Sequence, residues 1–359
     1  MSTALGSGRA AAQTITEIID FTGDGAGNFF SQPFGIAVDA AGNAYVAGRF
    51  SDNAFKITPA GVITEIIDAT GDGAGNGLDG PFIIAVHAAG NVYVTGQFSD
   101  NAFKITHAGV ITEIIDSTGD GVGNGLNQPL GIAVDATGNA YVTAGGTTNA
   151  FKITPAGVIT EIIDIAGDGA GNGLSHPFGI AVHASGNVYV TGFYSDNAFK
   201  ITPAGVITEI IDSTGDGAGN SLDAPWGIAV DAAGNAYVAG SFSDNAFKIT
   251  PAGVITEIID STGDGAGNIL NKPRGIAVRA AGNAYVTGQS SLNAFKITRA
   301  PNCNCPHDLD GDGNVGVADL LSLVMSWGPC KGCLADFDGN GSVGVSDLLA
   351  LLANWGPCL

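Results

Sequence analysis

Two stretches, PFGIAVDAAGNAYVAG (Pro33–Gly48) and NAFKITPAGVITEIID (Asn53–Asp68), decide the fold, because close copies of both recur along the chain. ITEIID occurs six times at a constant spacing of 48 residues, and AFKIT also occurs six times. A constant period of about 20–50 residues indicates one structural unit copied in tandem. The copies of ITEIID begin at Ile15, Ile63, Ile111, Ile159, Ile207 and Ile255.

Each repeat contains four short segments that favour β-strands, in the first copy residues 35–39, 43–48, 54–58 and 62–68. These segments are rich in β-branched and aromatic residues, which suit a pleated surface. Clusters of Gly, Asn, Asp and Pro separate them and are typical of turns. Four strands per repeat are typical of a propeller blade. The sequence therefore predicts an all-β, six-bladed β-propeller over residues 12–300.

The two ends of the repeat array predict how the propeller closes. The sixth repeat stops after AFKITRA (Ala294–Ala300) and lacks its ITEIID strand, whereas the chain begins with an extra copy at Thr14–Asp20. We expect this N-terminal strand to pair with the outer edge of the last blade. That pairing would close the ring and cover an open sheet edge.

The repeat units quoted above resemble NHL-type propellers and their relatives. The resemblance covers about residues 12–300 and implies a six-bladed propeller. It implies no single function, because that superfamily includes protein-binding, ligand-binding and lyase members, and one fold can carry many functions.

Charge and hydropathy exclude several classes of partner. The net charge is −21, from 34 acidic and 13 basic residues. Binding to nucleic acid or to an anionic membrane surface needs clustered Lys and Arg, so neither partner is expected. No stretch approaches the ~20 consecutive apolar residues of a membrane span.

Differences between the copies concentrate at two positions, one just before GIAV and one just after the YV strand. In an antiparallel four-stranded blade these two connections lie at the same end, so both positions map to one face around the channel mouth. An asymmetric set of aromatic and basic residues there predicts a ligand-binding surface. Drift of exposed loops is the alternative explanation. The candidate residues are Phe34, Arg49, His176, Phe193, Tyr194, Trp226, Lys272 and Arg274.

Residues 1–300 contain no recognisable catalytic motif, and we name no catalytic residue. His87 and His183 replace the Asp of GIAVD and are expected to be turn residues. The inter-blade loop that begins at Asp68 and continues through Asp72 to Asn76 favours Asx and Gly turns. Calcium binding by this loop stays open as an alternative.

Residues 303–359 contain a duplication in which each half has a twelve-residue cation loop. Acidic and amide side chains fill positions 1, 3, 5 and 12, and Gly fills position 6, as in an EF-hand loop with Asp at its last position. Two Ca²⁺ ions are expected, and the apolar spacing after each loop predicts one helix. The proposed ligands are Asp308, Asp310, Asp312, Asn314 and Asp319 in the first loop, and Asp336, Asp338, Asn340, Ser342 and Asp347 in the second.

These tandem loops, each followed by a single helix, resemble a dockerin of the first type over residues 305–358. The resemblance implies calcium ligation by the residues above and a cohesin-like protein partner bound through residues 303–359. The partner-recognition pairs would be Val317-Ala318 and Val345-Ser346, where polar pairs are usual in that family.

All five cysteines lie between Cys303 and Cys358. Their equal register in the two halves favours disulfides Cys305–Cys330 and Cys333–Cys358, with Cys303 left over. A zinc site made by Cys303, Cys305, Cys330 and Cys333 is the alternative.

Together these patterns predict an extracellular or cell-surface binding or scaffold propeller that carries a calcium-dependent docking module, within a polysaccharide-degrading or cell-surface assembly. Its propeller would hold a glycan or a protein. The alternative is a propeller lyase or glycan-active enzyme with its site at the channel mouth. The N-terminus MSTALGSGRAAAQ has no apolar segment typical of a signal peptide, so an extracellular location implies a truncated or misassigned start.

Overall fold

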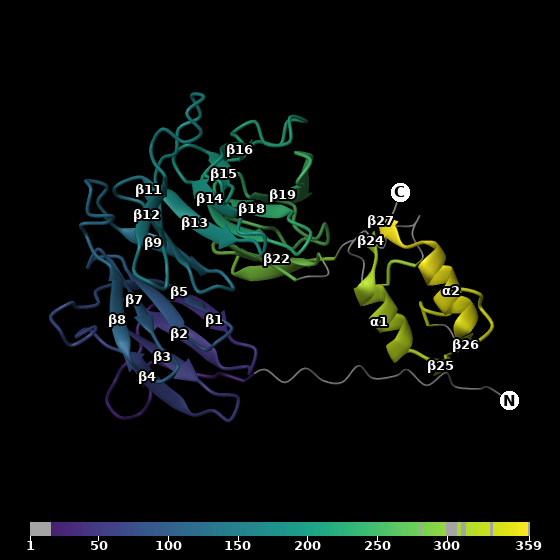
Figure 1. Cartoon of the computed structure of the whole chain (residues 1–359), viewed down its shortest axis with the longest axis horizontal. Coiled ribbons are helices and arrows are strands. Elements are labelled where there is room, and N and C mark those ends of the chain that lie inside the picture. The colour runs from purple at the N-terminus through teal and green to yellow at the C-terminus, as the bar shows by residue number, and fades with distance from the viewer. Residues whose placement is uncertain (1–15, 280–281, 299–306, 310–313, 331–332, 358–359) are drawn as a thin grey trace. The chain divides into compact units, whose positions relative to one another are not determined.

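The computed structural model describes residues 16–279, 282–298, 307–309, 314–330 and 333–357 (Figure 1). The predicted fold class is confirmed: the chain is a mostly-β, six-bladed propeller with only two short helices, both near the C-terminus. No helix in the described ranges is long and apolar enough to cross a membrane.

Blade 1 shows how each repeat builds a sheet. Its strands are β1 (Pro33–Val38), β2 (Ala44–Gly48), β3 (Asn53–Ile57) and β4 (Ile63–Ile67), paired antiparallel in chain order. The turn between β1 and β2 is held by Asp39, whose Oδ1 accepts hydrogen bonds from two backbone N–H groups within the next four residues. Local turn chemistry of this kind sets the register of consecutive strands.

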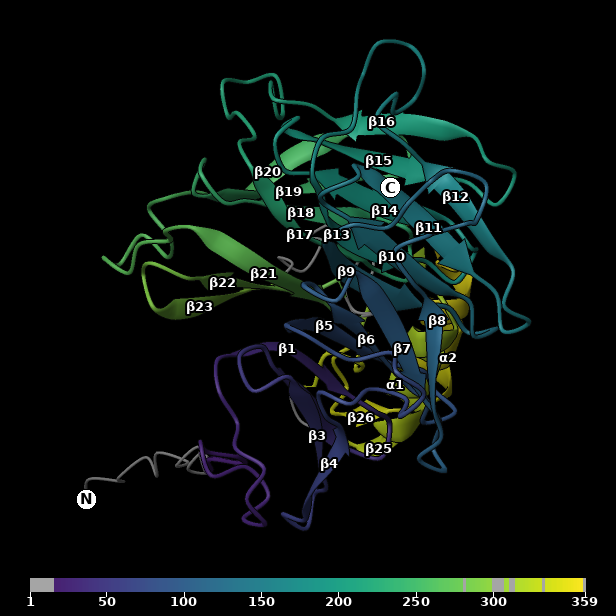
Figure 2. The same ribbon diagram turned by 90° about the vertical axis from the view of Figure 1, so that its left-hand side faces the viewer.

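The remaining blades repeat this order, and Figures 1 and 2 show blades 3 to 6 as successive sheets. Blade 2 comprises β5 (Pro81–Val86), β6 (Val92–Gly96), β7 (Asn101–Ile105) and β8 (Ile111–Ile115); blade 3 comprises β9 (Pro129–Val134), β10 (Ala140–Ala144), β11 (Asn149–Ile153) and β12 (Ile159–Ile163). Blade 4 comprises β13 (Pro177–Val182), β14 (Val188–Gly192), β15 (Asn197–Ile201) and β16 (Ile207–Ile211); blade 5 comprises β17 (Pro225–Val230), β18 (Ala236–Gly240), β19 (Asn245–Ile249) and β20 (Ile255–Ile259); blade 6 comprises β21 (Pro273–Val278), β22 (Ala284–Gly288) and β23 (Asn293–Ile297).

The predicted closing strand is not formed in the described part of the chain. Blade 6 has three strands, and residues 16–20 adopt no strand. Thr14 and Ile15, the first residues of the predicted strand, lie outside the described residues. The prediction relied on sequence identity with the fourth strands of the other blades, and residues 16–20, the part of that segment that the structure describes, do not pair with blade 6.

The hydrophobic core lies between neighbouring sheets. Two compact units make up the chain: one holds nearly all of blades 1 and 2, and the other holds blades 3 to 6 and the C-terminal residues. Between blades 1 and 2, residues such as Tyr45, Ile67, Val94 and Phe103 form one buried cluster. Equivalent clusters lie between blades 3 and 4, 4 and 5, and 5 and 6. The second and third strands of blades 2 to 5 are buried along nearly their whole length, whereas β23 of blade 6 is not.

Glycine allows the first strands of adjacent blades to approach closely. A Cβ added at Gly179 would lie 2.5 Å from the carbonyl oxygen of Trp226 in the next blade. Gly131 and Gly227 stand in the same relation to the carbonyl oxygens of Phe178 and Arg274. This approach brings the variable residues that precede GIAV in successive repeats next to one another.

In four of the repeats, a side-chain hydrogen bond also links the turn after the second strand to the following blade. Asp196 Oδ1 accepts a hydrogen bond from the backbone N–H of Ala224 at 2.8 Å. In the third repeat this aspartate is replaced by Thr148. We call these contacts blade latches; the others join Asp52 to Gly80, Asp100 to Gln128, and Asp244 to Lys272.

The C-terminal residues form a small duplicated unit with its own core. Its helices are α1 (Val317–Met325) and α2 (Val345–Ala353), each following one predicted cation loop. Two-residue strands pair the halves: β24 (Asn314–Val315) with β27 (Gly356–Pro357), and β25 (Gly328–Pro329) with β26 (Ser342–Val343). The buried members of the core are Val315, Leu323, Ala335, Val343 and Leu351.

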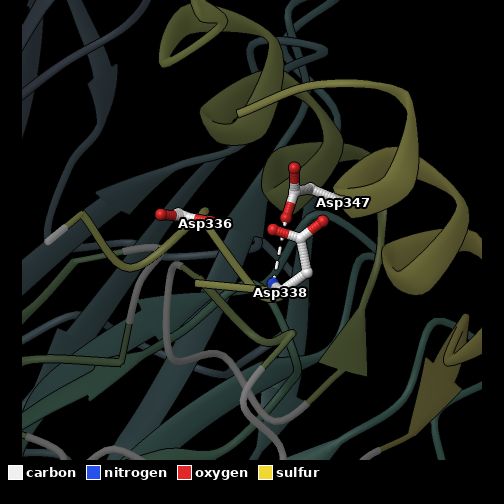
Figure 3. Close-up of side chains that lie close together, drawn as sticks. All are labelled: Asp336, Asp338 and Asp347. Atoms are coloured by element: carbon white, nitrogen blue, oxygen red, sulfur yellow. Dashed lines mark hydrogen bonds between the residues drawn. The ribbon is translucent and has the colours of Figure 1, made fainter. Parts of the chain in front are cut away.

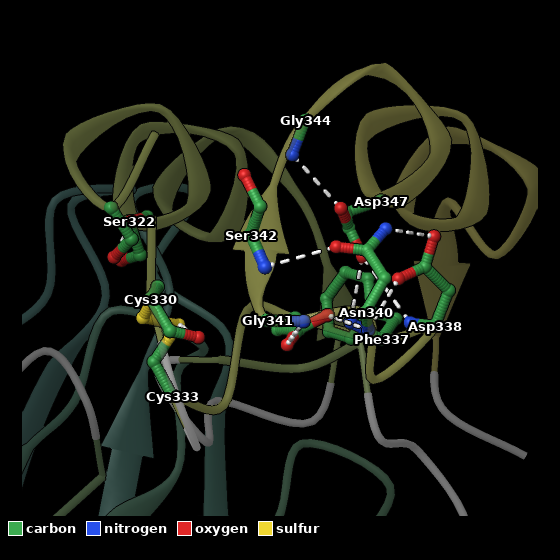
Figure 4. Close-up of a disulfide and its surroundings, with 12 residues drawn as sticks. Ser322, Cys330, Cys333, Phe337, Asp338, Asn340, Gly341, Ser342, Gly344 and Asp347 are labelled. Atoms are coloured by element: carbon green, nitrogen blue, oxygen red, sulfur yellow. Dashed lines mark hydrogen bonds between the residues drawn. A yellow bond between two sulfur atoms is a disulfide. The ribbon is translucent and has the colours of Figure 1, made fainter. Parts of the chain in front are cut away.

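The predicted disulfide pairs are corrected by the structure. Cys330 is bonded to Cys333, with their Cα atoms 5.7 Å apart, a normal separation for a disulfide (Figure 4). The predicted pairs Cys305–Cys330 and Cys333–Cys358 are therefore not formed. The remaining cysteines, Cys303, Cys305 and Cys358, lie outside the described residues.

Candidate functional site

Blades 4 to 6 bring most of the predicted ligand-binding residues into one cluster. Its members come from the first residues of β13, β17 and β21, from the residues just before β13 and β21, and from the residues just after β14 and β18. Blades 4 and 5 contribute at both variable positions and blade 6 at the first, so consecutive repeats place these side chains side by side. We call this cluster the Trp226 surface; it consists of His176, Phe178, Phe193, Tyr194, Trp226, Phe242, Lys272 and Arg274.

Arg274 stacks on Trp226 within this surface. Its guanidinium carbon lies 3.9 Å from the Trp226 ring centroid, and the Trp226 ring lies 3.7 Å from that of Phe178. The Arg274 Nε atom is buried and has no hydrogen-bond partner among the described residues. Burial lowers the pKa of Arg274, because removing water disfavours its charged form. The structure thus holds a half-buried cation against aromatic rings.

Phe193 forms the centre of the surface. Its buried ring lies 5.5 Å from the Trp226 centroid, 5.8 Å from that of Phe242 and 4.9 Å from that of Tyr194. Tyr194 and Phe242 are 69% and 57% exposed. Large aromatic rings that stay exposed beside a buried one offer flat faces for a ligand.

His176 lies at one margin of the surface and supports the loop beside it. Its Nδ1 is 3.0 Å from the carbonyl oxygen of Gly145, and its ring centroid lies 4.9 Å from that of Tyr194. Burial lowers the pKa of His176, although the hydrogen bond to Gly145 opposes the shift. Gly145 provides the room, because a Cβ there would meet the imidazole at 2.8 Å.

The two remaining candidates, Phe34 and Arg49, lie in a second cluster on blades 1 and 2. The Arg49 guanidinium carbon lies within 5.1–5.8 Å of four phenylalanine centroids, and its Nη2 donates a hydrogen bond to Gln97 Oε1 at 2.6 Å. Phe34 stacks on Phe82 with 4.0 Å between centroids. The other two rings belong to Phe50 and Phe98. Both clusters therefore combine aromatic rings with a guanidinium group.

Several contributors were not among the candidates chosen from the sequence. Phe178 and Phe242 complete the Trp226 surface, and Phe82 and Phe98 complete the cluster around Arg49. All four occupy the same two variable positions of the repeat as the predicted residues. An alignment of the six repeats that included every residue at these positions would have found them.

A groove of about 930 Å³ lies between blades 3 and 4, at the end opposite to these positions. Its polar side chains serve local structure: Asp135 accepts a hydrogen bond from Tyr141, and His183 contacts Ser185 Oγ and the carbonyl oxygen of Ala232. His183 Nδ1 also accepts the turn N–H of Ser185, as Asp does in other repeats. The prediction that His183 is a turn residue is confirmed.

The inter-blade loops show Asx-turn geometry. Asp68 Oδ1 accepts the N–H of Thr70, and Asp72 accepts the N–H of Ala74 and the side-chain amide of Asn76. The same contacts recur in the other copies, for example at Asp216. Turn chemistry thus accounts for these residues.

The second predicted cation loop gathers three carboxylates. One oxygen from each of Asp336, Asp338 and Asp347 lies within 4.8 Å of the others (Figure 3). Asp347 is buried and accepts hydrogen bonds from the N–H groups of Gly344 and Phe337 at 2.9 and 2.7 Å, which lower its pKa. Figure 4 shows the other two predicted ligands nearby: Asn340 bonds to Asp338, and the N–H of Ser342 donates to Asn340 Oδ1.

The first loop repeats the part of this geometry that the structure describes. Asp319 Oδ1 accepts the N–H of Leu309 at 2.6 Å, and its Oδ2 accepts the N–H of Gly316 at 2.7 Å. Asp319 is therefore the counterpart of Asp347. Asp308 is described and half-buried, and Asn314 lies in β24. The predicted ligands Asp310 and Asp312 lie outside the described residues.

The repeated sheets define the class of protein as a β-propeller with six blades. No protein-family model and no curated protein sequence matches the chain. Solved structures with a similar fold include a catalytically inactive virginiamycin B lyase from Staphylococcus aureus with quinupristin, at 21% identity and a TM-score of 0.59 over 74% of this chain and 80% of the other.

A streptogramin B lyase is similar at 18% identity and a TM-score of 0.56, covering 75% of this chain and 83% of the other. An auxiliary nutrient binding protein from Bacteroides thetaiotaomicron is similar at 15% identity and a TM-score of 0.53, covering 75% and 69%. At these identities the similarity shows the fold alone, and these structures include both lyases and a binding protein.

Proposed function

We propose that this protein is a non-enzymatic binding protein whose propeller holds a glycan or protein ligand on the Trp226 surface. The observation that carries this proposal is the Arg274 guanidinium stacked on Trp226 with its buried Nε unpartnered. A guanidinium group held against aromatic rings offers a ligand a flat cation with several N–H donors. Aromatic and arginine side chains in such clusters commonly dominate binding energy.

A lyase is less well supported by the residues of this surface. His176 is the histidine that would act as acid or base there, but its Nδ1 faces the carbonyl oxygen of Gly145. Among the described residues, three closely grouped acidic, histidine or cysteine side chains occur only at Asp336, Asp338 and Asp347, in the C-terminal loops. Binding therefore remains the favoured function.

Screening the full-length protein on glycan and peptide arrays tests the binding function. A ligand of the Trp226 surface should lose nearly all its signal in the triple variant Phe193→Ala, Trp226→Ala and Arg274→Ala. The matched control is Phe50→Ala, which removes an exposed aromatic ring from another blade. If the triple variant bound as well as the unchanged protein, the ligand would occupy another surface.

We further propose that the C-terminal loops bind two Ca²⁺ ions. Carboxylate oxygens are the ligands that this hard cation prefers, and the spacing of Asp336, Asp338 and Asp347 fits a single ion. Titration calorimetry should count about two sites per chain, falling to one in Asp336→Ala. Asp39→Ala, which removes a carboxylate from a propeller turn, is the control and should leave the count unchanged. An absence of binding heat would contradict this proposal.

Apolar stripes on α1 and α2 support a docking role for the C-terminal unit. Side chains at equivalent positions of the two helices are exposed: Val317, Leu321 and Val324 on α1, and Val345, Leu349 and Leu352 on α2. Unpartnered helix faces of this kind fit a protein partner. We propose a cohesin-like protein as that partner, at the cell surface or in an extracellular polysaccharide-degrading assembly.

Pull-down of a cohesin panel with the full chain tests this role. Capture should require calcium and should be lost in Leu321→Asp together with Leu349→Asp, with calcium titration showing that the loops remain intact. Capture that persists in EDTA, or in the double variant, would contradict docking through these helices.

A further inference from the structure

The distribution of positive charge singles out the Trp226 surface. Six of the 13 basic residues are the lysines of the repeated AFKIT strand, one per repeat. The sixth repeat is the one in which the two variable residues on either side of its proline, Lys272 and Arg274, are both basic. These two cations lie beside the aromatic rings, where the Asp244 carboxylate accepts the backbone N–H of Lys272.

The two cations flank the aromatic rings. Arg274 stacks on Trp226, and Lys272 Nζ lies 5.9 Å from the ring centroid of Phe242. Phe193 lies between those two rings. Arg274 has no carboxylate partner among the residues that the structure describes. A half-buried cation without a counter-ion is costly, so an anionic group on the ligand would be strongly favoured there.

The backbone of the same loops is already hydrogen-bonded. The N–H groups of Phe193 and Tyr194 donate to the carbonyl oxygens of His176 and Ser175, and the N–H of Phe242 donates to that of Asp223. Peptides usually bind by adding a strand to a free sheet edge or by inserting a helix into an apolar groove. This surface instead offers ring faces and cationic side chains, which suit a flat, anionic ligand.

Building on the proposed binding function, we infer that the ligand is a polysaccharide whose sugar rings carry carboxylates, with the rings stacking on the exposed Tyr194 and Phe242 and a carboxylate pairing with Arg274. The exposed faces of Tyr194 and Phe242 favour an extended chain over a small molecule, which would need an enclosing cavity to bury most of its surface. The acidic remainder of the protein would disfavour other orientations of such a ligand.

The test compares oligogalacturonate with its methyl-esterified form, in which the carboxylates are neutral. Binding to the full-length protein is measured by calorimetry and by fluorescence of its tryptophans. We expect the acidic form to bind at least about tenfold more tightly, and more weakly as salt rises. Arg274→Gln should abolish this preference, Arg274→Lys should keep part of it, and the exposed Arg279→Gln should leave it unchanged.

The outcomes separate this inference from the proposed function. Equal affinity for the two forms, or an unchanged preference in a folded Arg274→Gln variant, would overturn the carboxylate assignment while leaving saccharide binding in place. Binding of polyglutamate with the same dependence on Arg274 would overturn the saccharide class. If neither oligosaccharide nor any array glycan bound, the glycan form of the proposed function would itself fail.

Discussion

The imidazole Nδ1 of His176 lies 3.0 Å from the carbonyl oxygen of Gly145, joining the two segments that a blade latch joins in other repeats. In the next repeat the same link is made by Asp196 and the N–H of Ala224. The third repeat has Thr148 where that aspartate would stand. The contact that joins blades 3 and 4 therefore includes an imidazole, and protonation of His176 can change the stability of this contact.

Stability should fall at mildly acidic pH because of His176. Burial holds its pKa below the ordinary value of 6.5, so the unfolded chain takes up a proton more readily than the folded one. The contribution is fully present above about pH 6.5 and is lost as the pH falls toward the lower folded-state pKa. Thermal unfolding between pH 8 and pH 5 should show this loss, reduced in His176→Asn.

His183→Asn is the control for this experiment, because it removes another histidine from the same blade without touching the link to Gly145. It should keep the pH dependence of the unchanged protein. An identical profile for His176→Asn and the unchanged protein would show that another group controls it.

Thr148→Asp should stabilise the protein. Thr148 adopts a left-handed backbone conformation with φ of 59°, which β-branched residues disfavour and Asp tolerates. The new carboxylate could also accept the N–H of His176 as a blade latch. We expect a gain of about 1 kcal/mol in urea unfolding. Thr148→Gly relieves the strain without adding a latch and should gain less; an equal gain would exclude the latch.

Asp196→Ala should destabilise the protein by about 1–2 kcal/mol, because it removes a charged hydrogen-bond acceptor from the link between blades 4 and 5. The loss would appear as a lower denaturation midpoint with an unchanged slope. Asp212→Ala, in an exposed loop turn of the same blade, is the comparison. A loss no larger than in that variant would mean that the latch contributes little.

Gly179→Ala should cost about 1–3 kcal/mol and disturb the Trp226 surface, because the added methyl group would meet the Trp226 carbonyl oxygen at 2.5 Å. Gly275→Ala is the comparison: its methyl group would meet the side-chain hydroxyl of Thr287 at 2.7 Å and no carbonyl oxygen of another blade. Chemical unfolding and tryptophan fluorescence would measure both effects. Equal behaviour of the two variants would show that the approach of the strands is not limiting.

The blades could be predicted because every copy carries the same strand residues and turn signals. An ambiguous strand boundary in one copy can therefore be assigned from the other copies. The clustered surface residues could also be found from the repeats, since differences between copies stand out against a constant framework. The stacking of Arg274 on Trp226 was not predictable, because it depends on how closely two strands approach at Gly227. That distance is a property of packing.

Two predictions failed where symmetry in the sequence was taken for symmetry in space. The cysteines share a register in both halves, yet the disulfide joins Cys330 of the first half to Cys333 of the second. Residues 16–20 match the outer strands in sequence but form no strand in the structure. Local sequence similarity indicates which strand a segment is able to pair with. Whether the two strands pair depends on the tertiary packing around them.

The sameness of the blade edges also has a kinetic consequence. Strands with the sequence AFKIT can pair equally well with any ITEII strand of the chain, and equally well with one from another molecule. During folding, only the short connections between neighbours make the correct partner more accessible than the others. At high concentration, some newly made chains would therefore fold into the correct propeller, while others would exchange strands with neighbouring molecules. Such domain swapping is a characteristic failure of repeat proteins.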